Sequence, residues 1–148
     1  MGLLVAITCD PALHWMDYRI ELNGIALAWQ TDSFRDSFRE LLIAIGDALA
    51  GQSTYVEFTD VPLARRLSLE PSGERLVLSL LEYDNWPIRQ SAIGDPLGSV
   101  DVRLRTFAGA VLSQGQILGA DIAAYERASR HIFPHDCLAH LALVLRGK

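Results

Sequence analysis

Between Thr54 and Tyr83 the sequence alternates between apolar and polar residues, which is the pattern of β-strands with one buried face. In the run 54–59, Val56 and Phe58 fall on one face. The runs 65–70 and 75–83 alternate in the same way, and the segment between them contains a Pro and a Gly that suit a β-turn. This stretch therefore predicts antiparallel strands joined by short turns.

Matching the apolar faces sets the register that we expect for the hairpin between these two runs. Pairing Glu70 with Arg75 places Leu69 opposite Leu76 and leaves a four-residue loop, 71–74. A shift of one residue would place leucines opposite arginine and serine. We therefore expect the four-residue loop.

The composition is that of one globular domain spanning residues 1–148, because half of the 148 residues are apolar and no Ser/Pro/Gly-rich linker divides the chain. The longest charge-poor run, 1–9, is too short to span a bilayer, and no signal peptide is evident. The net charge of −5 argues against a nucleic-acid partner. We expect a cytoplasmic protein with neither a membrane nor a nucleic acid as its partner.

The remaining chain adds both strands and helices. Residues 2–9 read as a strand, and Asn23-Gly24 between two alternating runs is typical of a two-residue type I′ hairpin. Caps at 31–33 and Gly51 bound a helix whose apolar stripe includes Phe34 and Phe38. A strand over 100–104 and a helix over 106–129 follow. The segment 137–146 is either a helix or a strand, and its pattern favours a helix.

These elements predict an α+β fold. We expect a mainly antiparallel sheet of about six or seven strands, with two long helices and a short C-terminal helix packed against it. Phe38, Leu42, Leu78 and Val111 are expected to lie together in the core.

The first helix carries a candidate partner-binding face opposite its apolar stripe. Asp36, Glu40 and Asp47 lie there around Ile43. The like charges at Asp36 and Glu40, four residues apart, do not favour the helix itself, whereas a basic partner would explain them. The alternative is an ordinary solvated face with a single isoleucine.

A second group of residues could line a pocket. Gln114, Asp121 and Tyr125 lie on or beside the apolar stripe of the second helix, and Trp86 lies in the long Pro- and Gly-containing segment 84–98. A structural hydrogen-bond network is the alternative for the three helical residues.

The sequence contains few arrangements suited to catalysis. His131 and His135 have a helical i,i+4 spacing, but Pro134 lies between them, so no metal site is expected. The pairs Cys137–His140 and Cys9–His14 lack the setting of a nucleophile, and no phosphate-binding motif occurs, so no cofactor is expected.

Two patterns resemble a known group of proteins. The first is Phe58-Thr-Asp-Val-Pro62 followed by the hairpin 65–80, and the second pairs Leu104-Arg-Thr-Phe107 with the later Phe133-Pro134. Together they are similar to small, mostly uncharacterised bacterial proteins of the immunity type, which are found beside secreted toxins. Where related-looking proteins show Glu-Pro, this chain has Val61-Pro62, and no functional residue follows from the resemblance.

Three classes of function remain open. A non-enzymatic, protein-binding domain of immunity or inhibitor type, with a basic, toxin-like partner, fits the acidic charge and the missing catalytic motifs. A small-ligand-binding protein, or an enzyme with a nonstandard site under the 84–98 segment, is the alternative. A structural domain is the third, and the sequence determines neither the partner nor the oligomeric state.

Overall fold

The computed structural model describes residues 2–147. Within that range the chain forms seven strands, a 3₁₀ turn and four α-helices. The strands are β1 (Leu4–Asp10), β2 (Trp15–Leu22), β3 (Ile25–Thr31), β4 (Thr54–Asp60), β5 (Leu63–Ser72), β6 (Arg75–Tyr83) and β7 (Asp95–Arg103). The helices are α1 (Ser37–Leu49), α2 (Leu104–Leu118), η1 (Gly119–Asp121, 3₁₀), α3 (Ile122–Ser129) and α4 (His135–Arg146).

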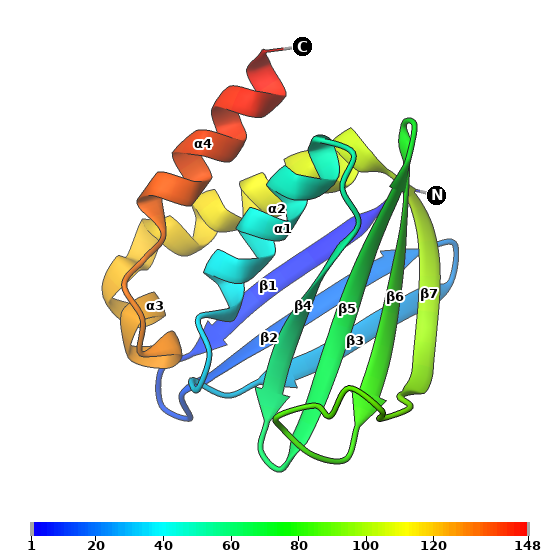
Figure 1. Cartoon of the computed structure of the whole chain (residues 1–148). Coiled ribbons are helices and arrows are strands. Elements are labelled where there is room, and N and C mark those ends of the chain that lie inside the picture. Colours follow the sequence, from blue (N-terminus) through cyan, green and yellow to red (C-terminus); the bar gives the residue numbers. More distant parts are fainter. Residues whose placement is uncertain (1, 148) are drawn as a thin grey trace.

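The expected α+β class and the antiparallel pairing of the strands are confirmed. The strands are divided between two sheets, β1-β2-β3 and β4-β5-β6-β7, which cross one another in Figure 1. Each strand pairs with its neighbour in sequence, so every connection within a sheet is a hairpin or a loop. The turn between β4 and β5 and the loop between β6 and β7 lie side by side at the lower edge of Figure 1.

Aromatic side chains join the two sheets. Tyr18 and Trp29, from neighbouring strands of the first sheet, stack with ring centroids 5.3 Å apart. Phe58 of β4 meets both rings edge-on, at 4.9 Å from Tyr18 and 5.1 Å from Trp29. All three side chains are buried, so the inner faces of the two sheets share one core.

The helices complete this core. α1 packs against β4 and β5, while α2 packs against β1. The expected core residues Phe38, Leu42, Leu78 and Val111 are all buried in the same cluster. α4 rests on α1 and α2 and runs upward, away from the sheets (Figure 1). The segment 137–146 is thus helical.

The expected register of the β5–β6 hairpin is wrong by two residues. Leu69 pairs with Leu78 and Ser72 with Arg75, so the loop contains two residues, Gly73 and Glu74. Gly73 has φ +60°, as the first central residue of a type II′ turn requires. A shift of two keeps each leucine on its face, which is why face-matching alone did not distinguish the registers.

Several boundaries also differ from the sequence-based expectations. The first helix begins at Ser37, not in the segment 31–33, and α2 begins at Leu104. The expected helix over 106–129 is broken at Gly119. Strand β7 begins at Asp95, so the connection after β6 is the shorter loop 84–94. By contrast, Asn23 and Gly24 both have positive φ, which confirms the type I′ hairpin.

No helix within residues 2–147 is both long enough and apolar enough to cross a membrane.

Candidate functional site

The expected acidic face of α1 is largely neutralised by the chain's own arginines. Arg35 Nη2 donates to both carboxylate oxygens of Glu40, each at 2.9 Å. Asp36 lies 3.3 Å from Arg39 Nε, and the Nη1 of the same arginine reaches Asp136 of α4 at 3.0 Å. Glu40 and Asp36 are therefore already paired with arginines before any partner binds, and Arg39 also links α1 to α4.

The other two residues of that face remain accessible to different degrees. Ile43 is 51% exposed, and Asp47 is half-buried near the end of the helix. The structure thus leaves an exposed apolar side chain on α1 with one acid one turn beyond it.

Each of the three expected pocket residues of the second helix has a different role in the fold. Gln114 Oε1 accepts a hydrogen bond from the backbone N–H of Ile7 on β1, at 3.0 Å. Asp121 caps α3 by accepting from the N–H of Ala124 at 3.1 Å. Tyr125 is fully buried, and this burial raises the pKa of its hydroxyl. The three side chains are thus engaged in the fold.

Trp86, the fourth expected pocket residue, lies in the loop 84–94 between β6 and β7. This loop and the β4–β5 turn lie at the lower edge of Figure 1, which we call the loop end of the molecule. Its ring meets Phe34 edge-on at 5.0 Å, and the guanidinium of Arg35 lies 5.6 Å from its centroid. The buried donors Trp86 Nε1 and Arg35 Nε have no acceptor within residues 2–147. The contacts of this junction are therefore aromatic and cationic.

Asp32 fixes the chain around this junction. Its Oδ1 accepts from the N–H of Phe34 at 3.0 Å and from the Thr59 hydroxyl at 2.7 Å. Its Oδ2 accepts from the N–H of Val61 in the β4–β5 turn at 3.1 Å. A single carboxylate thus joins the connection before α1 to the turn between β4 and β5.

These contacts place Phe34 beside both Val61 and Trp86. Phe34 and Val61 are each 61% exposed, and Ile93, in the same loop as Trp86, is 94% exposed. We call Phe34, Val61, Trp86 and Ile93 the loop-end patch. Sequence reasoning found only Trp86, because it placed Phe34 on the buried stripe of a longer helix.

The 84–94 loop is anchored at both ends and encloses a hollow. Trp86 rests on Phe34, while Gly94 lies so close to β6 that an added Cβ would come within 2.7 Å of the Tyr83 ring. The hollow has a volume of about 260 Å³. Its lining residues are Tyr83, Asp84, Asn85, Pro87, Arg89, Ala92 and Ile93.

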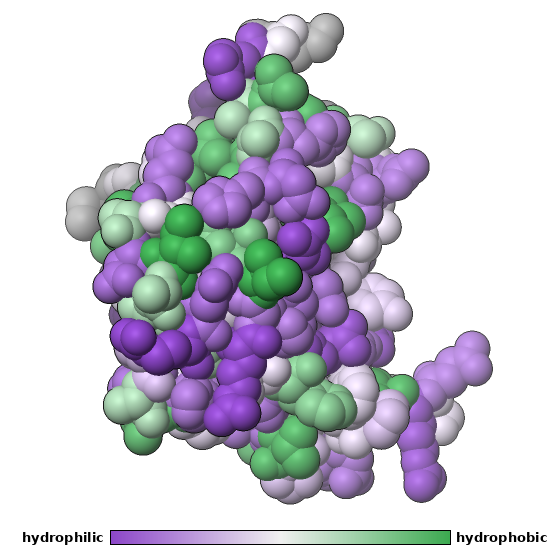
Figure 2. All heavy atoms as spheres, turned by 90° about the vertical axis from the view of Figure 1, so that its left-hand side faces the viewer, coloured by the Kyte–Doolittle hydropathy of each residue, from purple (hydrophilic) through white to green (hydrophobic). Residues whose placement is uncertain are grey.

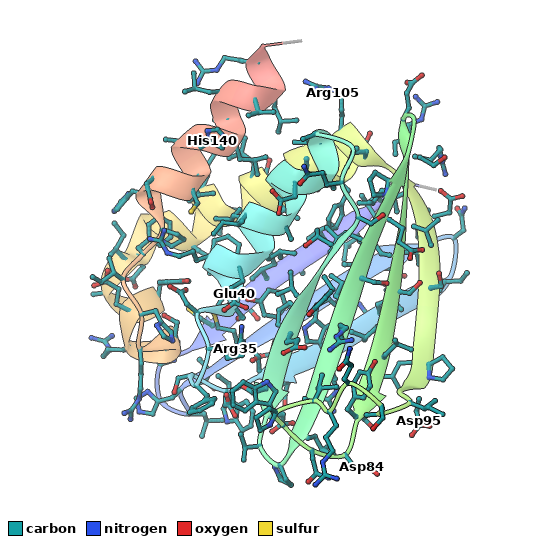
Figure 3. All side chains as sticks on the ribbon, viewed as in Figure 1. Arg35, Glu40, Asp84, Asp95, Arg105 and His140 are labelled. Atoms are coloured by element: carbon teal, nitrogen blue, oxygen red, sulfur yellow. The ribbon has the colours of Figure 1, made fainter. Side chains whose placement is uncertain are left out.

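Acidic side chains prevail around this end. Arg65 is engaged by Glu82 at 2.9 Å and by Asp60 at 3.4 Å. Asp84 and Asp95 are exposed at the lower edge of Figure 3, and neither forms an ion pair within residues 2–147. Arg89, in the same loop as Asp84, is an exposed positive charge, so two free acids face one free arginine at the loop end.

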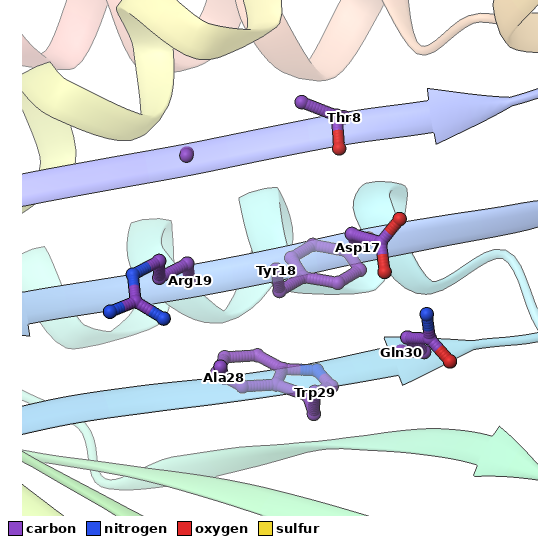
Figure 4. A pocket seen from close by; sticks show the side chains of 8 residues that line it. Thr8, Asp17, Tyr18, Arg19, Ala28, Trp29 and Gln30 are labelled. Atoms are coloured by element: carbon purple, nitrogen blue, oxygen red, sulfur yellow. The ribbon is translucent and has the colours of Figure 1, made fainter.

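A larger hollow, about 430 Å³, lies elsewhere, on the outer face of the first sheet. Its space arises because Ala6 and Ala28 flank Arg19 across three strands. Thr8, Asp17 and Gln30 form a polar row beside them (Figure 4). No segment closes over this face in Figure 1, so a ligand there would remain open to water.

The side of the molecule formed by α3 and α4 shows apolar side chains scattered among polar ones (Figure 2). Ile132, which precedes α4, and Leu143 on α4 are strongly exposed, as is Ile117 near the end of α2. Single exposed apolar residues of this kind are normal on protein surfaces.

The cysteines and histidines are not arranged for nucleophilic chemistry. Burial raises the pKa of the Cys137 thiol, although Arg39 opposes this effect from 3.3 Å away. Burial also raises the pKa of Cys9. His14 Nδ1 lies 2.7 Å from the carbonyl oxygen of Arg127. Both thiols are thus protonated near neutral pH, and within residues 2–147 no three His, Cys, Asp or Glu side chains converge as metal ligands.

Comparison with known proteins gives no relative: no family model, no curated protein and no solved structure matches the chain.

Proposed function

We propose that the chain is a non-enzymatic, protein-binding domain of immunity or inhibitor type that binds a basic protein through its loop-end patch. The observation that carries this proposal is the exposure of Phe34, which packs on Trp86, of Val61, which shares Asp32 with Phe34, and of Ile93 in the loop that carries Trp86. Aromatic residues and arginine are enriched at the centres of protein interfaces, where they supply most of the binding free energy. Phe34, Trp86 and Arg35 provide that combination.

The rigidity of the patch supports its use in binding. Asp32 holds both Phe34 and Val61 through backbone hydrogen bonds, at 3.0 and 3.1 Å. Trp86 contacts both Phe34 and Arg35. Side chains that are ordered before binding lose little conformational entropy when a partner docks.

The charge around the patch indicates the class of partner. Asp84 and Asp95 are exposed there, while Arg65 is neutralised by Asp60 and Glu82. Clustered acids accelerate the encounter with a positively charged surface and favour a basic partner over an acidic one. The net charge of −5 acts in the same direction over longer distances.

The outer face of α1 is a second candidate surface, favoured by the exposure of Ile43 beside Asp47. It ranks below the loop-end patch because Glu40 and Asp36 already pair with Arg35 and Arg39. A basic partner that binds the acids of this face would have to replace those arginines with its own cations.

Site-directed photocrosslinking in the native host tests the proposal. A photoreactive residue is placed at Ile93, at Ile43 or, as a matched exposed control, at Ile117. We expect one basic protein to crosslink at position 93 in stoichiometric yield and to form a salt-sensitive complex when both proteins are purified. Crosslinking at position 43 would move the interface to α1. Equal crosslinking at 93 and 117, or a purified pair that does not associate, would refute a loop-end interface.

A further inference from the structure

We infer that the hollow beneath the 84–94 loop is an anchor site for one lysine or arginine side chain of the basic partner. This inference rests on the proposed function and specifies how the partner is recognised. The hollow lies next to the loop-end patch, because the loop that encloses it also carries Trp86 and Ile93.

The size of the hollow fits a side chain better than a free ligand. Pockets for small molecules usually occupy about 300–1,000 Å³. At about 260 Å³ the hollow falls below that range, so it suits part of a larger molecule whose remaining contacts lie outside. The neighbouring patch offers those contacts.

The lining matches the two parts of a long basic side chain. Pro87, Ala92 and Ile93 present apolar surface to the methylene stem, and Asp84 and Asn85 present oxygen acceptors to the cationic head. Asp84 forms no ion pair within the described part of the chain, so its carboxylate is free to accept the cation.

The chain's own cations bear on this site in two ways. Arg66 lies 5.3 Å from the Tyr83 ring, but it is held by Glu57 at 2.7 Å and stacked on Tyr55, so it does not compete for Asp84. Arg89 is the opposing charge in the lining, and its side chain is exposed. Removal of the Arg89 charge should therefore strengthen binding of a cation, whereas removal of the Asp84 charge should weaken it.

Selection from a display library of random peptides provides the probe. Peptides are selected on the parent protein and counter-selected on the double variant Phe34→Ala/Ile93→Ser, so that only patch-dependent binders survive. We expect these peptides to share one lysine or arginine. Replacing that residue by the uncharged norleucine should weaken binding about tenfold, which corresponds to about 1.4 kcal/mol.

A double-mutant cycle then identifies the contact. Asp84→Asn should weaken binding of the basic peptide by a similar factor. It should leave binding of the norleucine peptide unchanged, because the substitution in the protein and that in the peptide remove the same interaction. Arg89→Gln should strengthen binding of the basic peptide. Glu70→Gln, an equal change of charge at the exposed far end of β5, should have no effect.

The outcomes separate this inference from the proposed function. Patch-dependent peptides without a shared basic residue, or an Asp84→Asn loss that persists with norleucine, would overturn the anchor site alone. A selection that yields no patch-dependent peptide would count against the loop-end patch as a binding surface, and the anchor site would be refuted with it.

Discussion

Two glycines of the second helical segment allow close packing of the C-terminal part of the chain. A Cβ added at Gly115 would overlap a methyl carbon of Leu138 and lie 3.2 Å from the Phe38 ring. One added at Gly119 would lie 3.0 Å from the Phe133 ring. Glycine costs roughly 1 kcal/mol in a helix relative to alanine, so the close contact explains why it is present.

The variant Gly115→Ala tests this explanation against a matched control on the same helix. At Gly109 an added Cβ meets nothing within 4 Å, so Gly109→Ala should stabilise the fold by up to about 1 kcal/mol. Gly115→Ala gains the same helix propensity but must displace Leu138, and overpacking costs about 1–3 kcal/mol. We expect Gly115→Ala to be less stable than Gly109→Ala by at least about 1 kcal/mol in urea unfolding. Equal stabilities would mean that α4 moves aside without cost.

Phe34 shows why a residue of the loop-end patch can be misassigned from sequence. Phe34 and Phe38 are four residues apart, as on one helical face, and the segment 31–33 offers cap residues. In the structure Asp32 instead bonds to Thr59 and Val61, which are distant in sequence, and the chain turns helical only at Ser37. Local periodicity contains no information about those long-range bonds.

The two hairpins differ in how far their local sequence determines the turn. Asn23-Gly24 specifies its turn by itself, because few other residues adopt positive φ twice in succession. The β5–β6 turn offered two candidates that differ by two residues, and the apolar faces agree with both. The antiparallel architecture was therefore predictable, whereas the register and the division into two sheets were not.

β1 is an edge strand whose free side faces α2, and Gln114 supplies one of its hydrogen bonds. Replacing Gln114 by Met keeps the length of the side chain but leaves the N–H of Ile7 without this acceptor. We expect a loss of about 1–2 kcal/mol in the free energy of unfolding, as for other half-buried donors left unpaired. Gln116→Met, at an exposed position of α2, is the control and should change stability by less than about 0.5 kcal/mol. Equal effects of the two variants would contradict a structural role for Gln114.

The attachment of α4 to α1 should depend on pH through Asp136. The hydrogen bond from Arg39 holds the pKa of this carboxyl below its ordinary value of 3.8. Because the pKa is lower in the folded than in the unfolded state, the stabilisation is complete above the ordinary pKa and is lost as the pH falls through the folded-state value.

The variant Asp136→Asn isolates this contribution. We expect it to be less stable than the parent protein at about pH 6, and the difference should disappear as the pH is lowered below the pKa of Asp136. Carbon-13 titration of the Asp136 carboxyl provides an independent readout, since Arg39→Gln should return its pKa toward 3.8. A stability difference that stays constant with pH would assign the effect to the cap region of α4 instead.

The loop-end patch exists only in the folded chain. Phe34, Val61 and Trp86 come from three connections, and their proximity follows from the crossing of two sheets and from the hydrogen bonds of Asp32. The sequence indicated that the 84–98 segment could border a site, but it did not indicate which residues would lie beside it. The acidic composition, by contrast, was evident from the sequence and pointed to a basic partner.

The affinity of the purified partner for patch variants tests the central claim most directly. We compare the double variant Phe34→Ala/Ile93→Ser with Ile117→Ser/Leu143→Ser, which removes two other strongly exposed apolar side chains, from α2 and α4. Both variants should fold as the parent protein does, as judged by circular dichroism and melting temperature. We expect the patch variant to bind at least about 30-fold more weakly, which corresponds to about 2 kcal/mol, and the control variant to bind as the parent does. Unchanged affinity of the patch variant, or an equal loss in the control, would contradict binding through the loop end.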